Sequence, residues 1–186
     1  MDEFSYLSVL LSIILGLAIT QVLKGLRGLI LARHQVQHYW PSVLWAIFIL
    51  LICVQSWWAM FGMRAMKVWG FLDFLVVLAQ TIVTYLIAAL VFPDFGQQTV
   101  DLRAHYFNHA RWFFGLIVGV LLISILKEWM LAGSWPAPAN LLFHLLFMAL
   151  ALIAAFARSP WLHKALPLAS LAVLAFYIAF LYARLA

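Results

Sequence analysis

The sequence predicts an all-α, polytopic membrane protein: a bundle of six transmembrane helices that forms one domain over residues 1–186. The chain is 68% hydrophobic and 9% charged, and its mean hydropathy is +1.08, well above the range of soluble domains. The apolar residues fall into six runs, each close to the roughly 20 residues that a helix needs to cross a bilayer. Lipid offers the backbone no hydrogen-bond partners, and no run alternates as a barrel strand does. We therefore expect helices.

The expected spans cover residues 4–30, 41–63, 71–92, 107–129, 139–157 and 165–185. Turn-forming residues such as Pro93 and Pro160 occupy the breaks, and tryptophans gather near the span ends, where the indole ring favours the headgroup layer. The first span begins with Asp2 and Glu3 and has no small-residue cleavage site, so we expect a retained helix instead of a signal peptide. Six spans leave no room for a separate soluble domain.

Positive charge is divided unequally between the two ends of the expected bundle. The side that includes the gaps after the first, third and fifth spans, counted together with the adjoining span ends, holds seven of the 11 Lys and Arg residues and carries the whole net charge of +5, whereas the opposite side balances to zero. The positive-inside rule then predicts a cytoplasmic basic side and periplasmic termini. The cations are spread over short loops without a groove-sized stripe. Anionic lipid headgroups are therefore the expected partner, and nucleic acid is not.

Small residues recur at helical spacing in three spans. The rows are Ser8, Ser12, Gly16 and Thr20 in the first span, Gly115 and Gly119 in the fourth, and Ala165, Ala169, Ala172, Ala175, Ala179 and Ala183 in the sixth. Such rows allow close approach between helices. They would serve packing inside the bundle or contacts between copies, and we expect a homo-oligomer.

Polar residues within the first three spans suggest a path for an ion or a small solute. The candidate path residues are Ser8, Ser12, Thr20, Gln21, Gln55, Asp73, Gln80 and Thr84. Asp73, Gln80 and Thr84 share one face of a helix, and Asp73 is an acidic residue that lies within a span. Ionisable groups inside a membrane are costly and are often functional. The alternative is that these side chains form hydrogen bonds between helices and seal the bundle.

Two histidine pairs lie on the basic side. His34 and His38, like His105 and His109, are four residues apart, which on a helix places both imidazoles on one face and within reach of one metal ion. Asp101 extends the second pair as a third ligand or as a hydrogen-bond acceptor. These five residues are candidate metal or haem ligands. The alternative is an ordinary role at the headgroup layer.

Other chemistry-bearing residues carry weaker signals. His144 and Asn140, four residues apart, are expected to form an interhelical hydrogen bond or to line an outer vestibule. The sequence has no phosphate-binding loop and no HExxH or GxSxG motif. Ser12 and Ser124 have no histidine nearby in the sequence, so a hydrolase would need a nucleophile assembled from several helices. Cys53 is the single cysteine, and we expect it to pack as a small apolar residue.

Several stretches in the first two thirds of the chain carry a resemblance to known sequences. They are residues 11–26 (LSIILGLAITQVLKGL), 39–41 (YWP), 57–58 (WW), 92–94 (FPD) and 106–115 (YFNHARWFFG). Together they resemble a family of small multi-pass bacterial membrane proteins. The resemblance implies a bacterial inner-membrane location and assigns no function and no catalytic residue.

Three function classes follow from these observations. The first is a homo-oligomeric channel-like or transporter-like unit for an ion or small solute, and the second is a non-catalytic binding or accessory protein. The third is a metal- or haem-binding redox protein that uses the histidines of the basic side. Residues 93–111 are the segment favoured for any chemistry, although the pattern does not indicate that chemistry occurs. Within them, Thr99 to Arg111 is predicted to form an amphipathic interfacial helix that leads into the fourth span.

Overall fold

The computed structural model describes residues 3–66, 68–95, 99–157 and 159–181. In this part of the chain, six helices are long and apolar enough to cross a membrane, so the predicted all-α six-helix bundle is confirmed. The helices are α1 (Glu3–Leu31), α2 (Trp40–Met60), α3 (Phe71–Leu90), α4 (Leu102–Ala132), α5 (Pro138–Phe156) and α6 (Pro160–Leu181). A 3-10 helix, η1 (Phe61–Ala65), continues α2.

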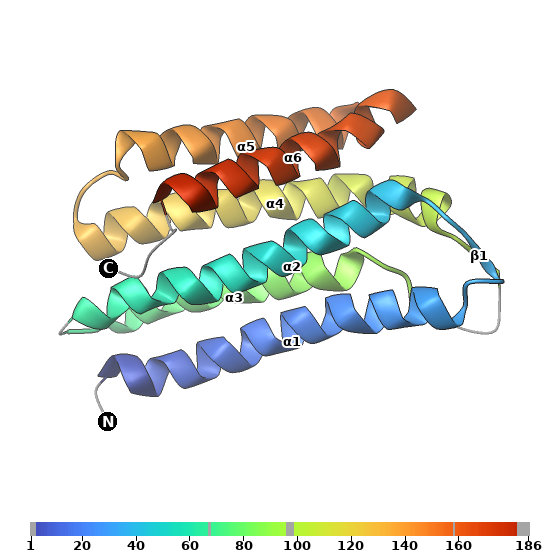
Figure 1. Cartoon of the computed structure of the whole chain (residues 1–186). Coiled ribbons are helices and arrows are strands. Elements are labelled where there is room, and N and C mark those ends of the chain that lie inside the picture. Colours follow the sequence, from blue (N-terminus) through green and yellow to red (C-terminus); the bar gives the residue numbers. More distant parts are fainter. Residues whose placement is uncertain (1–2, 67, 96–98, 158, 182–186) are drawn as a thin grey trace.

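The helices run up and down in alternation, so α1 begins and α6 ends at the same end of the bundle (Figure 1). We call this the termini end; it also holds the α2–α3 and α4–α5 links. The opposite end is called the strand end, because two short strands lie there. The main packing pairs are α1 with α3, α3 with α4, and α4 with α5, whereas α6 packs on α2 and α5. By contrast, α2 and α4 touch at few places.

The two strands were not expected from the sequence. β1 (Val36–Gln37) and β2 (Val100–Asp101) pair in parallel, with Val36 opposite Val100. The pairing joins the α1–α2 link to the segment before α4. It thereby fixes the strand end of the bundle.

Two helix starts differ from the expected ones. α4 begins at Leu102 instead of residue 107, because the Asp101 side chain accepts hydrogen bonds from the backbone of Arg103 and Ala104 and caps the helix. The expected interfacial helix is therefore the first part of one continuous helix. α6 begins at Pro160 instead of residue 165, so the buried Pro167 lies inside it. Residues 182–185 of the expected sixth span lie outside the described residues.

The core of the strand end is aromatic. We define the aromatic cluster as Trp45, Tyr106, Phe113, Phe114 and His163, all of which are buried. The Trp45 ring lies 5.2 Å from Phe114 and 5.7 Å from Phe113, centroid to centroid, in edge-to-face arrangements. Such arrangements are favoured by the ring quadrupoles. The cluster joins α2, α4 and α6 into a closed layer.

The small-residue rows do not carry the packing within the chain. A Cβ added at Gly16, Gly115 or Gly119 would meet no atom within 4 Å. The described alanines of the sixth-span row, from Ala165 to Ala179, are exposed. The expectation that these rows pack inside the bundle is therefore wrong, and the alternative of contacts between copies stays a prediction. Close approach occurs instead at Gly25, where an added Cβ would lie 2.9 Å from the Cβ and Cγ atoms of Phe92 and closer still to the ring carbon Cδ2.

Candidate functional site

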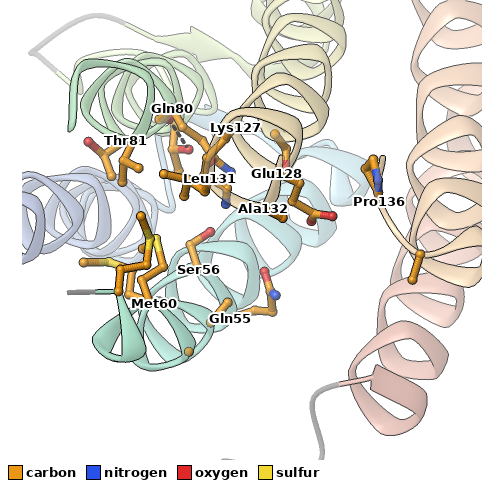
Figure 2. A pocket seen from close by; sticks show the side chains of 18 of the residues that line it. Gln55, Ser56, Met60, Gln80, Thr81, Lys127, Glu128, Leu131, Ala132 and Pro136 are labelled. Carbon is orange, nitrogen blue, oxygen red and sulfur yellow. Dashed lines mark hydrogen bonds between the residues drawn. The ribbon is translucent and has the colours of Figure 1, made fainter. Parts of the chain in front are cut away.

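A cavity of about 430 Å³ opens at the termini end, between α2, α3 and α4. Figure 2 shows Gln55, Ser56 and Met60 of α2 facing Lys127, Leu131 and Glu128 of α4, with Gln80 and Thr81 of α3 beside them. The space exists because α2 and α4 touch at few places and leave their facing side chains unpacked against one another. We call it the outer cavity.

The rim of the outer cavity is formed by the α4–α5 link. α4 ends at Gly133, whose left-handed φ of 63° closes the helix with a 3.0 Å bond from its backbone N–H to the carbonyl of Trp129. Residues 134–137 then cross the mouth of the cavity, with Pro136 buried, and Pro138 opens α5. Pro is favoured at a first helical position because its ring presets φ. Gly133 at the end of α4 and Pro138 at the start of α5 therefore fix the two ends of this link.

A second space of about 100 Å³ continues from the outer cavity into the middle of the bundle. The two share the lining residues Gln55, Ser56, Gln80, Thr84, Ser124 and Tyr177. The deeper space, which we call the inner pocket, is walled by Phe48, Phe143, Phe147 and Leu174. Phe48 packs on Trp45 at 5.3 Å, so the inner pocket ends at the aromatic cluster. The combined cavity is therefore polar at its mouth, apolar at its floor and closed toward the strand end.

The outer cavity contains two charged residues, Lys127 and Glu128, which differ in their hydrogen-bond partners. The Glu128 carboxylate accepts a 2.6 Å hydrogen bond from the Asn140 side-chain amide, whose oxygen accepts from the Tyr177 hydroxyl at 3.2 Å. Lys127 is half-buried, and no ion pair to its ammonium group occurs in the described part of the chain. Asn140 supplies Glu128 with a hydrogen bond, and Lys127 interacts electrostatically with the neighbouring Glu128 while it lines the outer cavity.

A serine and a histidine meet where the outer cavity joins the inner pocket. Ser124 of α4 and His144 of α5 are both buried, and Ser124 Oγ lies 2.9 Å from His144 Nε2. The other ring nitrogen, Nδ1, lies 2.8 Å from the backbone carbonyl oxygen of Asn140. A carbonyl only accepts, so Nδ1 carries the hydrogen and Nε2 accepts from the serine hydroxyl. Ser124 lines both spaces, and His144 lines the inner pocket.

The structure brings three of the candidate path residues together. Gln55, Gln80 and Thr84 line both the outer cavity and the inner pocket. Asp73 lies apart from them at the start of α3, where its carboxylate accepts a 3.1 Å bond from the Gly70 backbone. There it acts as a cap for the helix.

The path residues of α1 lie elsewhere. Ser8 and Ser12 line a separate groove of about 350 Å³ beside Trp57 and Phe61. Thr20 is exposed and donates to the carbonyl of Gly16. Gln21 donates a 3.1 Å bond to the Tyr85 hydroxyl, between α1 and α3. The α1 row therefore does not continue the cavity between α2, α3 and α4.

The histidine pairs make mostly backbone contacts. His34 lies in a turn and His38 precedes α2, so the helical argument for that pair was wrong. His105 Nε2 donates to the Leu90 carbonyl at 3.1 Å, and His109 Nδ1 donates to the His105 carbonyl at 2.9 Å. Their ring centroids are 4.4 Å apart. Asp101 stands before the helix as its cap and does not extend the row.

The candidate histidines and Asp101 do not form a group with enough ligands for a metal ion in the described residues. Within the described ranges, no group of three His, Cys, Asp or Glu side chains is close enough to hold one ion. Protein sites for zinc use at least three such ligands. The metal or haem hypothesis stays a prediction, and no chemistry is derived from it.

The contact between Ser124 and His144 at the cavity junction was not predicted from the sequence. Ser124 and His144 are 20 residues apart and lie on different helices, so no local motif marks them. A signal was present nevertheless. The α4–α5 link is centred near residue 135, and two antiparallel helices bring positions equally far from their link to the same depth. Ser124 and His144 lie 11 and 9 residues from that centre and so come to nearly the same depth, and each is a polar residue within an apolar span.

Comparison with known proteins gives no relative: no family model matches the chain, and no curated protein and no solved structure matches it either. The fold and the site define this protein as an integral membrane helix bundle with a cavity open at one end.

Proposed function

We propose that this protein binds a small amphiphilic molecule, which enters the bundle from the termini end. The observation that carries the proposal is the continuity of a polar outer cavity with an apolar inner pocket, across shared residues such as Gln80 and Thr84. Ligand sites are typically concave spaces of about 300–1,000 Å³ with a few placed polar groups, and the outer cavity falls in that range.

The lining favours one orientation of the ligand. Lys127 and the side-chain amides of Gln55 and Gln80 offer donors to an anionic or hydrogen-bond-accepting head. The rings of Phe48 and Phe147 offer apolar surface to a short tail. Binding would therefore place the head near the membrane surface and the tail toward the middle of the bundle.

The one-sided cavity also supports a second candidate, a transporter-like unit. Transporters that work by alternating access hold their substrate near the middle of the bilayer, in a site open to one side at a time. An open channel is less well supported, because the aromatic cluster closes the space below Phe48. With the orientation expected from the charge distribution, the cavity would open to the periplasm of a bacterial inner membrane, where copies of the chain would associate.

Protection of an introduced cysteine tests ligand binding. In a Cys53→Ala background reconstituted in nanodiscs, Thr84→Cys places a thiol where both spaces meet. MTSES, an anionic methanethiosulfonate, should label this thiol, and hexanoate should slow the labelling several-fold by occupying the cavity. Absence of labelling, or labelling that neither hexanoate, hexanol nor hexyltrimethylammonium slows, would overturn the proposal.

A matched control separates occupancy of the cavity from effects on the membrane. Val68 lies on the α2–α3 link at the same end, is 79% exposed and does not line the cavity. Val68→Cys should react with MTSES at one rate with and without hexanoate. Uptake of a labelled carboxylate into proteoliposomes, competed by unlabelled hexanoate, would favour the transporter candidate over binding alone.

A further inference from the structure

The cavity contains the parts of a nucleophile and a base at the junction of its two spaces. Ser124 Oγ and His144 Nε2 lie 2.9 Å apart, which is within hydrogen-bond reach for proton transfer. The Asn140 carbonyl holds Nδ1 at 2.8 Å and so fixes both the tautomer and the direction of the ring. A base that is oriented by a third group is the arrangement that activates serine nucleophiles.

The position of Ser124 between the two spaces determines where the tail and the carbonyl group of a substrate would lie. Ser124 borders both the polar outer cavity and the apolar inner pocket, and its hydroxyl is held by His144, which lines the inner pocket. A molecule with a short acyl tail in the inner pocket, beside the packed rings of Phe48 and Phe147, and a polar leaving group near Lys127 would present its carbonyl at this boundary. That description fits a short-chain carboxylic ester.

Hydrogen-bond donors for the developing oxyanion are present in the same lining. The side-chain amides of Gln55 and Gln80 border both spaces, and in the described chain neither makes a side-chain hydrogen bond. Donors placed where charge develops stabilise the tetrahedral intermediate of acyl transfer. The amides are therefore available to the substrate and need not first break an internal bond.

We infer that Ser124 and His144 form a nucleophile–base pair that hydrolyses a short-chain carboxylic ester bound in this cavity. This inference rests on the proposed binding function and adds a reaction to it. Ser124 Oγ bonds to the carbonyl carbon while its proton passes to His144 Nε2. The ester C–O bond then breaks, and the leaving alcohol takes that proton.

Water completes the cycle. A water molecule from the outer cavity gives a proton to His144 Nε2 and attacks the acyl-serine carbonyl carbon. The carboxylic acid leaves, and Ser124 Oγ regains its proton from the imidazole. The net reaction is hydrolysis of the ester by water, without a change of oxidation state. The histidine returns to the tautomer with hydrogen on Nδ1, which the Asn140 carbonyl selects.

A covalent probe tests the pair without any mutation. The wild-type protein in nanodiscs is treated with a biotinylated fluorophosphonate, which reacts with activated serines, and the modified peptide is located by mass spectrometry. We expect the adduct on Ser124, together with hydrolysis of p-nitrophenyl butyrate. If Thr84→Cys is still protected by hexanoate while Ser124 carries no adduct, the binding proposal stands and the hydrolase inference is overturned.

Variants then separate catalysis from structure. Ser124→Ala and His144→Gln should each lower the hydrolysis rate by about 10²–10⁴-fold, the usual contribution of such groups. Ser42→Ala removes a buried hydroxyl of α2 that lines neither the outer cavity nor the inner pocket, and it should retain most of the rate. Retention of wild-type hydrolysis by a folded Ser124→Ala protein would overturn the inference, and so would an equal loss in Ser42→Ala.

Discussion

The hydroxyl of Tyr106 donates a 2.9 Å hydrogen bond to Nδ1 of His163 and thereby joins α4 to α6 inside the aromatic cluster. The other ring nitrogen, Nε2, lies 2.8 Å from the Ala157 carbonyl, which only accepts, so Nδ1 must be the acceptor. Trp45 Nε1 donates to the same tyrosine oxygen at 3.3 Å. Three helices therefore meet at one phenolic oxygen directly below the cavity floor.

Replacing Tyr106 with Phe should destabilise the protein. The change removes both bonds and leaves the buried Trp45 N–H and the His163 Nδ1 without partners, which costs about 1–3 kcal/mol for an unsatisfied buried group. Thermal unfolding in detergent, followed by circular dichroism, measures the loss.

Tyr39→Phe is the matched control for that change. Tyr39 packs 5.2 Å from Tyr106, centroid to centroid, and burial raises the pKa of its phenol, but its hydroxyl finds no hydrogen-bond partner among the described residues. Removing an unpaired buried hydroxyl should leave the melting temperature unchanged or slightly raised. A larger loss in Tyr39→Phe than in Tyr106→Phe would contradict the assigned bonds.

The cap of α4 predicts a smaller effect at the strand end. Asp101→Ala removes the oxygen that accepts from the backbone of Arg103 and Ala104 and should cost about 0.5–2 kcal/mol. Asp101→Ser retains a capping oxygen and should recover most of the stability. Asp94→Ala is the control, because its bond to Lys24 is an exposed ion pair of little energetic value. Equal losses at the two aspartates would argue against the cap.

The six helices follow from the sequence, whereas the start of α4 and the β1–β2 pairing do not. The six apolar runs predicted the helices because hydrocarbon imposes the same length and polarity on every span. The fourth span was expected from residue 107, with a surface helix leading into it, because residues 102–106 are polar enough to look like a surface segment. The structure has one continuous helix that begins at Leu102, after the Asp101 cap. The β1–β2 pairing depends on two links that meet only in the folded bundle.

The site was harder to predict than the fold. Gln55, Gln80 and Thr84 were named as path residues because polar groups inside an apolar span stand out, and all three line the cavity. The α1 row was grouped with them on spacing alone, and spacing on one helix does not say which neighbour the face meets. The partnership of Ser124 with His144 depends on the registry of two helices, which is a tertiary property.

The orientation of the bundle can be tested with two exposed positions. Val68 lies at the termini end and His38 at the strand end, before α2. In cells of a bacterial host, with Cys53→Ala as background, Val68→Cys should react with externally added MTSES, whereas His38→Cys should react only after the cells are permeabilised. The expectation follows from the seven basic residues on the strand-end side. The reverse pattern would place the cavity mouth in the cytoplasm.

Lys127 should set the charge preference of the cavity. Removing its charge with Lys127→Met should lower the rate at which anionic MTSES labels Thr84→Cys, relative to cationic MTSET, by about tenfold, which corresponds to about 1.4 kcal/mol. That is a reasonable energy for one charge in a partly shielded space. Arg64→Met is the control, because Arg64 is exposed at the same end and stacks 3.7 Å over the Phe61 ring, outside the cavity lining. An equal effect of both variants would mean that the surface potential, and not Lys127, governs entry.

The last prediction concerns the contact that fastens α1 to the end of α3. An added Cβ at Gly25 would lie 2.9 Å from the Cβ and Cγ atoms of Phe92, which is itself buried and has little room to move. Gly25→Ala should therefore destabilise the protein by about 1–3 kcal/mol, the usual cost of overpacking, despite the better helix propensity of alanine. Gly16→Ala, on the same helix but with no atom within 4 Å of the new Cβ, should be neutral or stabilising by up to about 1 kcal/mol. Thermal unfolding of the two variants side by side measures the difference, and a neutral Gly25→Ala would show that α1 and α3 are not held together at this glycine.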